Sequence, residues 1–218
     1  MAIGVALILS ALLLFGYNRY EEKSAGQEAE LLLESMQNVI AERKAEDSFS
    51  AQGGINHGAD VSEKEGTSNE TEKECDYEDA ALPEELPVIN MEGYDYIGYL
   101  SIPSLNLDLP VMSDWDYKRL KKAPCRQCGS TATDDLVIAA HNYKTHFGSL
   151  SKLEVGAEIS FTDMDGMEND YVLERVEIMM PDAVDAVVDS DYDLVLYTCT
   201  PGGKSRVVAF CNRVVKPN

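Results

Sequence analysis

Residues 193–208, DLVLYTCTPGGKSRVV, carry the clearest indications of the fold and the chemistry of the chain. Its first half is an apolar run rich in β-branched and aromatic residues, which predicts a buried strand that stops at Pro-Gly-Gly. A second apolar run begins directly after Arg206 and predicts a returning strand. A short loop would bring the thiol of Cys199 close to the guanidinium of Arg206. This pair indicates a nucleophile and an anion stabiliser.

Other short strands are predicted in the C-terminal part of the chain. Apolar runs separated by Pro and Gly residues predict strands at 94–102, 105–111, 136–140, 158–162, 171–179, 194–198 and 207–215. So many short strands with little helical periodicity predict an all-β fold, a closed antiparallel β-barrel with short helices. Residues 113–122 are expected to form one such helix. The barrel domain is predicted to span residues 86–218.

The N-terminal segment is expected to anchor the chain in a membrane. Residues 2–17 are uncharged and almost wholly apolar, slightly fewer than the roughly 20 that a spanning helix needs. A signal peptide, a signal anchor and a buried core helix all fit this composition. The missing basic flank and cleavage site favour an uncleaved transmembrane signal anchor at residues 1–20. Arg19 and Lys23 follow the span and by themselves favour a cytoplasmic C-terminal side, so we hypothesise that the native start lies upstream of Met1.

Two further segments lie between this anchor and the barrel. Residues 21–45 predict a juxtamembrane stalk helix, because apolar residues recur at helical spacing among charges, at Leu32, Met36, Val39 and Ile40. Residues 46–85 hold 13 Asp and Glu residues, two Lys and almost no apolar residues. Such a segment buries too little surface to offset its chain entropy, which predicts a disordered acidic linker.

The overall charge argues against one class of partner. The chain has 39 acidic and 18 basic residues, a formal net charge of -21, and no Lys/Arg cluster suited to phosphates. Nucleic acid is therefore not expected as a partner.

A histidine completes a set of catalytic side chains. His141 follows the predicted strand at 136–140, a position where a rigid scaffold can hold a catalytic side chain; a structural role is the alternative. Its imidazole could take the proton that makes Cys199 a nucleophile and later protonate a leaving amine. Arg206, or the competing candidate Arg213, could bind the oxyanion, and the backbone N–H of Thr200 is a second predicted oxyanion donor.

These residues resemble the sortases, the membrane-anchored cysteine transpeptidases of Gram-positive bacteria. The family's Thr-Leu-x-Thr-Cys strand end is matched at Leu196, Thr198 and Cys199, with Val195 in place of the first Thr. The family's histidine corresponds to His141 and its arginine to Arg206. The likeness extends over about residues 94–215 and implies a sortase-like barrel, class B-like or related, with the subclass left open.

The resemblance also implies a reaction. Cys199 would attack the C-terminal sorting motif of a secreted protein, form a thioacyl intermediate, and pass the acyl group to a cell-wall or pilin amine. We expect no metal or cofactor, and a single-pass cell-membrane protein with an extracytoplasmic catalytic domain. The alternatives are a non-catalytic surface-anchored β-barrel binding module and a zinc hydrolase that uses His141, His146 and a cysteine.

One motif has no counterpart in this resemblance. Cys125 and Cys128 form a C-x-x-C pair in a predicted loop, and a redox motif, half of a zinc site and a local disulfide all remain open. Calcium dependence, the sorting motif and the acceptor amine also remain open.

Overall fold

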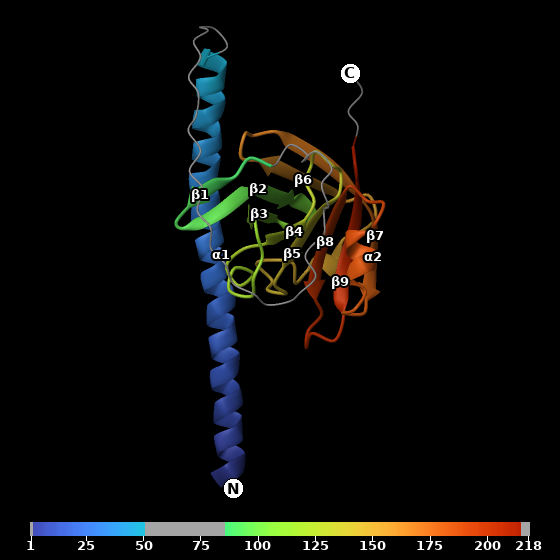
Figure 1. The fold of residues 1–218 in the computed structure, drawn as a ribbon. Helices are drawn as coiled ribbons and strands as arrows, with labels where there is room; N and C mark the ends of the chain where they lie inside the picture. The colour runs from blue at the N-terminus through green and yellow to red at the C-terminus, as the bar shows by residue number, and fades with distance from the viewer. Residues whose placement is uncertain (1, 51–85, 215–218) are drawn as a thin grey trace, which may run out of the picture.

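The chain folds as a β-barrel that lies along one long helix (Figure 1). The structure is a computed structural model and describes residues 2–50 and 86–214. Its helices are α1 (Ala2–Ser50), α2 (Val184–Val188) and the 3-10 turns η1 (Pro103–Leu105) and η2 (Leu150–Lys152). Its strands are β1 (Ile89–Met91), β2 (Tyr94–Ile102), β3 (Leu107–Met112), β4 (Cys125–Cys128), β5 (Leu136–Ala140), β6 (Glu158–Asp163), β7 (Glu168–Met179), β8 (Leu194–Cys199) and β9 (Arg206–Arg213). The predicted linker lies outside the described residues, apart from 46–50, which belong to α1.

Eight of these strands close into a ring. The strand order is β1-β2-β3-β4-β5-β8-β9-β7-β6, and the additional β2–β6 pairing joins the two ends, so that β1 is an extra strand on β2. This confirms the predicted all-β barrel. Pairing around the ring is antiparallel except for β3–β4 and β5–β8, which are parallel. The fully antiparallel pattern predicted from short runs therefore misses two pairings, because each joins strands connected by long segments.

One glycine allows β2 and β6 to lie close together where the ring closes. Gly98 on β2 has φ +147°, and a Cβ there would lie 2.1 Å from the carbonyl oxygen of Thr162 on β6. Only a residue without a side chain lets the two backbones approach this closely.

All seven predicted strands are present, with ends shifted by a few residues, whereas β1 and β4 were not predicted. The strand β4 contains the C-x-x-C pair that we placed in a loop. Its sequence is short and half polar, so no apolar alternation marks it. Residues 113–122 form turns and not the predicted helix. The Asp116 carboxylate accepts hydrogen bonds from the N–H groups of Lys118 and Arg119 at 2.6 and 2.9 Å, as at a helix N-terminus, but the turn that it caps does not extend into a helix.

The strands around the predicted nucleophile are apolar on both faces. Leu194 and Leu196 of β8 point into the barrel core, while Val195 belongs to a second cluster on the outer face with Val208 of β9 and Val187 of α2. Strands covered on both sides need apolar residues at every position, which explains the continuous apolar runs in the sequence.

The helix α1 covers both the predicted anchor and the predicted stalk. Residues 3–20 are exposed, and α1 is the one helix in the described ranges that is long and apolar enough to cross a membrane. Beyond them, Ala25, Ala29, Met36 and Ile40 are buried at helical spacing against the barrel. The apolar face that predicted a stalk is therefore a packing surface of the barrel and does not face solvent.

Candidate functional site

The ends of three strands meet at one edge of the barrel. Cys199 is the last residue of β8 and pairs directly with Arg206, the first residue of β9. Strands β5 and β8 run parallel with Ala140 level with Thr198, which sets His141 beside Cys199 at the next position. Because Ala140 and Thr198 face the core, the alternation along each strand turns the next residues to the outer face. The strand registers thus place the three predicted residues at neighbouring positions on one face of the sheet.

A buried hydroxyl ties the nucleophile strand to the histidine strand. Thr198 is 3% exposed, and its Oγ1 donates a hydrogen bond of 2.8 Å to the carbonyl oxygen of Ala140. This bond joins the residue before Cys199 to the residue before His141. Thr198 was matched to a family motif in the sequence, and the structure supplies a physical reason for a hydroxyl at this position.

The turn after Cys199 is held by several hydrogen bonds. The Thr200 N–H donates to the carbonyl oxygen of Ser205 at 2.9 Å, and the hydroxyls of these two residues lie 3.0 Å apart. Gly202 and Gly203 have φ of +86° and +70°, which allow the tight reversal. The predicted oxyanion donor at Thr200 is thus engaged within the turn in this structure. Its use on an oxyanion would require that bond to open.

The two candidate arginines occupy different environments. Arg206 is partly exposed at the site, with Nη1 3.3 Å from the carbonyl oxygens of Gly203 and Ser205. Arg213 lies at the opposite end of β9, where its Nε donates to Asp134 at 2.6 Å and its other nitrogens bond Asn169 and Thr131. Arg213 joins neighbouring segments far from Cys199, and Arg206 is the arginine beside the thiol.

The imidazole of His141 is half-buried. Its Nδ1 lies 3.0 Å from the backbone N–H of Asn142 and 3.1 Å from Asn142 Oδ1. Burial lowers the pKa of His141, against an opposing effect of the Asn142 hydrogen bond. A lowered pKa keeps the ring neutral at pH 7, and a neutral imidazole can accept a proton.

Sequence reasoning missed the residue that packs on this imidazole. The ring of Tyr143 stacks on the ring of His141 with centroids 4.1 Å apart and an interplanar angle of 11°. The Tyr143 hydroxyl donates to Glu21 Oε2 of α1 at 3.4 Å. The only signal for the stack in the sequence is that an aromatic residue lies two positions after His141. The sequence contains no signal that pairs Tyr143 with Glu21, 122 positions away.

His146 lies beneath this stack. It is fully buried, and neither ring nitrogen has a hydrogen-bond partner among the described residues. Burial lowers its pKa to about 4, with a smaller contribution from His141. Its ring centroid is 5.5 Å from that of Tyr143. His146 is thus a neutral packing residue behind the site.

The C-x-x-C cysteines face different clusters of the protein. Cys125 packs with Met36 and Tyr96 near α1, whereas Cys128 packs with Val195 and other residues of the outer-face cluster. Cys125 is a free thiol in this structure, and burial raises its pKa to about 12. The Cys125 thiol is therefore a poor nucleophile at pH 7. Cys128 is also buried, whereas Cys199 is partly exposed.

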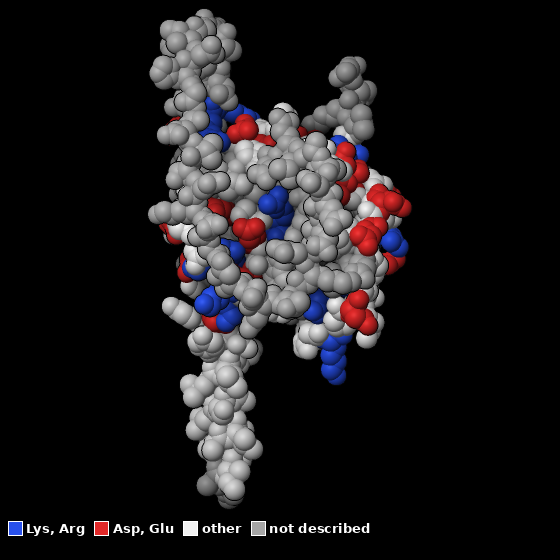
Figure 2. All heavy atoms as spheres, in the orientation of Figure 1, with Lys and Arg blue, Asp and Glu red and all other residues white. Residues whose placement is uncertain are grey.

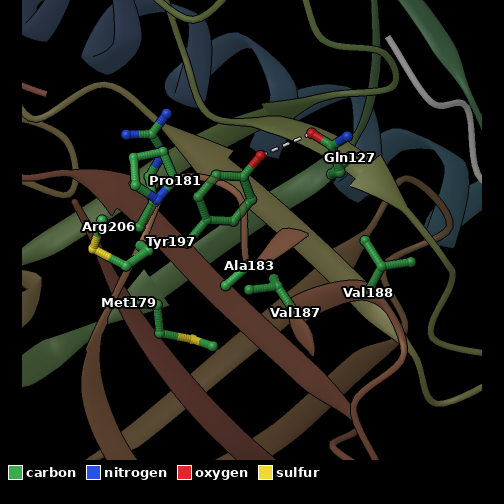
Figure 3. A pocket seen from close by; sticks show the side chains of 9 residues that line it. Gln127, Met179, Pro181, Ala183, Val187, Val188, Tyr197 and Arg206 are labelled. Carbon is green, nitrogen blue, oxygen red and sulfur yellow. Dashed lines mark hydrogen bonds between the residues drawn. The ribbon is translucent and has the colours of Figure 1, made fainter. Parts of the chain in front are cut away.

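An apolar groove lies beside the start of β9. Its walls come from β4, α2, the β7–β8 loop and the ends of β7, β8 and β9. The labelled side chains are Gln127, Met179, Pro181, Ala183, Val187, Val188, Tyr197 and Arg206 (Figure 3). Tyr197 stands in the middle of the groove, and its hydroxyl donates to Gln127 Oε1 at 2.8 Å. Tyr197 is two residues before Cys199 on the same face of β8, and Arg206, the strand partner of Cys199, also lines the groove.

Comparisons with known proteins identify the family. A family model of the sortase domain matches residues 100–214, and no curated protein matches the chain. The solved structure of sortase A from Corynebacterium diphtheriae is similar, with a TM-score of 0.50 and 23% identity over 57% of this chain and 64% of that one. For sortase C from Clostridium perfringens SM101 the TM-score is 0.48 and the identity 24%, over 56% of this chain and 71% of that one. For sortase C1 from Streptococcus suis the TM-score is 0.48 and the identity 22%, over 56% of this chain and 74% of that one. Because the sortase domain matches more than half of its 218 residues, the chain belongs to the sortase family.

Proposed function

We propose that this sortase acts as a membrane-anchored cysteine transpeptidase whose nucleophile is Cys199. The observation that carries the proposal is the meeting of three strand ends, in which Cys199 pairs with Arg206 and lies beside His141. A thiol, a neutral imidazole and a guanidinium are the groups that thiolate acyl transfer requires.

The proposed reaction has two steps at one thiol. His141 takes the thiol proton, and the sulfur of Cys199 adds to the carbonyl carbon of the scissile peptide bond. Arg206 stabilises the resulting oxyanion. Collapse of this intermediate breaks the C–N bond, His141 protonates the leaving amine, and a thioester remains on Cys199. A second amine then attacks the thioester, loses a proton to His141 and expels the thiolate.

The apolar groove is the proposed binding site for the sorting motif. Val187, Val188 and Met179 form apolar walls, and Tyr197 and Arg206 also line the groove. An extended peptide in this groove would place an apolar side chain against these walls and its carbonyl at the thiol. The proposed substrates are secreted proteins with a C-terminal sorting motif, and the proposed acceptor is a cell-wall or pilin amine.

The proposed location is the cell membrane, with the catalytic domain outside. Support comes from the apolar start of α1, where residues 3–20 are exposed, and from the family to which the chain belongs. A single pass by this segment would hold the barrel at the outer surface.

The test is capture of a thioacyl intermediate. The full chain in detergent micelles is incubated with a library of peptides that carry varied C-terminal motifs, and intact mass spectrometry detects acylation. Acylation is expected in the parent chain and in a Cys75→Ser control, and is expected to be lost in Cys199→Ala. Peptide binding without acylation in the parent chain would refute the transpeptidase and favour the binding module.

A further inference from the structure

The catalytic edge of the barrel and the exposed half of α1 lie at the same end of the molecule. In Figure 1 the N-terminal half of α1 extends beyond the barrel on the side where the β8–β9 turn lies. The contacts agree, since one depression is lined both by Phe15 and Arg19 of α1 and by His141 and Asn142. A residue of the apolar segment therefore shares a surface with the candidate catalytic histidine.

Specific contacts fix this arrangement. Glu21 forms an ion pair with Lys121 at 3.3 Å and accepts the hydrogen bond from Tyr143. The carboxylate of Glu22 accepts from the backbone N–H of Lys144 at 2.7 Å, and its carbonyl accepts from the Thr145 hydroxyl at 3.2 Å. These bonds join α1 to the segment that follows His141.

The distance from the apolar segment to the site is short. The uncharged run ends at Tyr17, four residues before Glu21, which is about 6 Å along a helix. At the other end of the barrel, Arg43 of α1 forms an ion pair with Asp165 of the β6–β7 turn at 2.9 Å. Glu21 and Arg43 are separated by about 33 Å of helix. If residues 2–17 cross a bilayer, the edge with Cys199 faces its surface and the β6–β7 turn points away.

The charge of this edge fits an anionic surface. The formal net charge of the whole chain is -21. The segment that begins at His141, residues 141–149, nevertheless contains Lys144 as its one Lys, Arg, Asp or Glu residue, and the β8–β9 turn, residues 200–205, contains Lys204 as its one. Both are exposed lysines. Figure 2 shows Lys and Arg side chains at the lower end of the barrel, around the base of the protruding helix, together with some Asp and Glu side chains. The acidic Glu21 and Glu22 at this end are engaged by Lys121 and Arg19.

We propose that the catalytic edge of the barrel is a membrane-contacting surface, which binds anionic lipid headgroups through Lys144 and Lys204. The proposal rests on the proposed anchoring of α1, but it does not depend on the transpeptidase chemistry. Its consequence is that the thiol works at the bilayer surface. A lysine near an anionic leaflet strengthens such contact by about fivefold.

The first test measures which end of the barrel faces lipid. The full chain is placed in phospholipid nanodiscs that contain phosphatidylglycerol and nitroxide-headgroup lipids, with a fluorophore on Cys199 in a Cys75→Ser background. The matched control carries the fluorophore on Met167→Cys of the β6–β7 turn, with Cys75→Ser and Cys199→Ala. We expect strong quenching at position 199 and little at position 167. Equal quenching, or stronger quenching at 167, would overturn the proposal.

A second variant moves the catalytic edge away from the bilayer without changing any residue of that edge. Seven helix-forming polar residues inserted after Tyr17 would lift the barrel by about 10 Å, or about two turns, while α1 stays packed from Glu21 onward. Quenching at Cys199 should fall, and labelling of Cys199 in detergent should stay unchanged. Unchanged quenching would contradict the geometry.

The role of lipid charge is tested separately. Replacing phosphatidylglycerol by phosphatidylcholine, or Lys144 and Lys204 by glutamine, should reduce the quenching at Cys199. Quenching that is insensitive to both changes would refute the lysine contacts. A chain that does not enter nanodiscs would refute the anchor and this proposal together, whereas thioacyl capture in micelles would still report on the chemistry.

Discussion

The buried imidazole of His146 should make the barrel unusually sensitive to mild acid. Burial lowers the pKa of His146 to about 4, whereas a histidine in the unfolded chain titrates near 6.5. The unfolded chain therefore binds a proton at this residue over a pH window in which the folded chain does not. His146 therefore has no effect on the pH dependence of the free energy of unfolding above pH 6.5. As the pH falls from 6.5 toward 4, it lowers that free energy.

The magnitude follows from the two pKa values. Between pH 7.5 and pH 5, this single histidine should lower the free energy of unfolding by about 2 kcal/mol, and the full difference below pH 4 is about 3 kcal/mol. His146→Leu removes the titrating ring and replaces it with an apolar side chain in a fully buried site. At pH 7.5 the variant should be as stable as the parent or about 1 kcal/mol more stable, because two unpartnered nitrogens are removed.

Urea unfolding of the full chain in micelles at pH 7.5, 6 and 5, followed by circular dichroism, measures the effect. The stability difference between His146→Leu and the parent should widen by about 2 kcal/mol on going to pH 5. The control is His141→Gln, which removes the half-buried histidine and should leave most of the pH dependence in place. Parallel pH curves for His146→Leu and the parent would refute the reasoning and would mean that the ring is solvated or hydrogen-bonded.

Substitutions at four further residues test the site and the barrel closure. Arg206→Lys should reduce thioacyl formation at least tenfold and leave the unfolding midpoint unchanged. Arg213→Lys should lower the free energy of unfolding by about 1–3 kcal/mol and leave thioacyl formation intact. The opposite pattern would assign the oxyanion role to Arg213. Thr198→Val removes a buried hydrogen bond, so urea unfolding should show a loss of about 1–3 kcal/mol, while Thr198→Ser should retain most of the stability. Gly98→Ala places a methyl group 2.1 Å from a carbonyl oxygen, and a folded variant with a loss below about 1 kcal/mol would contradict the close β2–β6 approach.

The strands that position the candidate site were predictable for a physical reason. Strands β5 and β8 are buried on both faces, so their sequences are continuous apolar runs, and the residues after each run mark the strand ends. The pairing of Cys199 with Arg206 also followed from the sequence, because a short turn between two strands leaves few registers.

The parts that sequence reasoning missed depend on contacts between distant segments. The strand β4 has no apolar alternation, and it forms because β5 and β3 lie on either side of it. The packing of α1 on the barrel could not be predicted from its composition either, since an apolar helix face fits a free stalk as well as a docked helix. Charges such as Lys121 and Glu21 pair only once the fold brings them together.

The docked helix changes how the anchor and the candidate site are related. By sequence they are separate segments joined by a linker, whereas in the structure Glu21 bonds Tyr143, whose ring stacks on His141. Removing α1 would also expose the cluster that Met36 and Ile40 complete, which includes Met112 of β3. A barrel without α1 therefore loses both a buried apolar surface and a support for its candidate catalytic histidine. Activity measured on such a fragment would describe a different site from the one in the full chain.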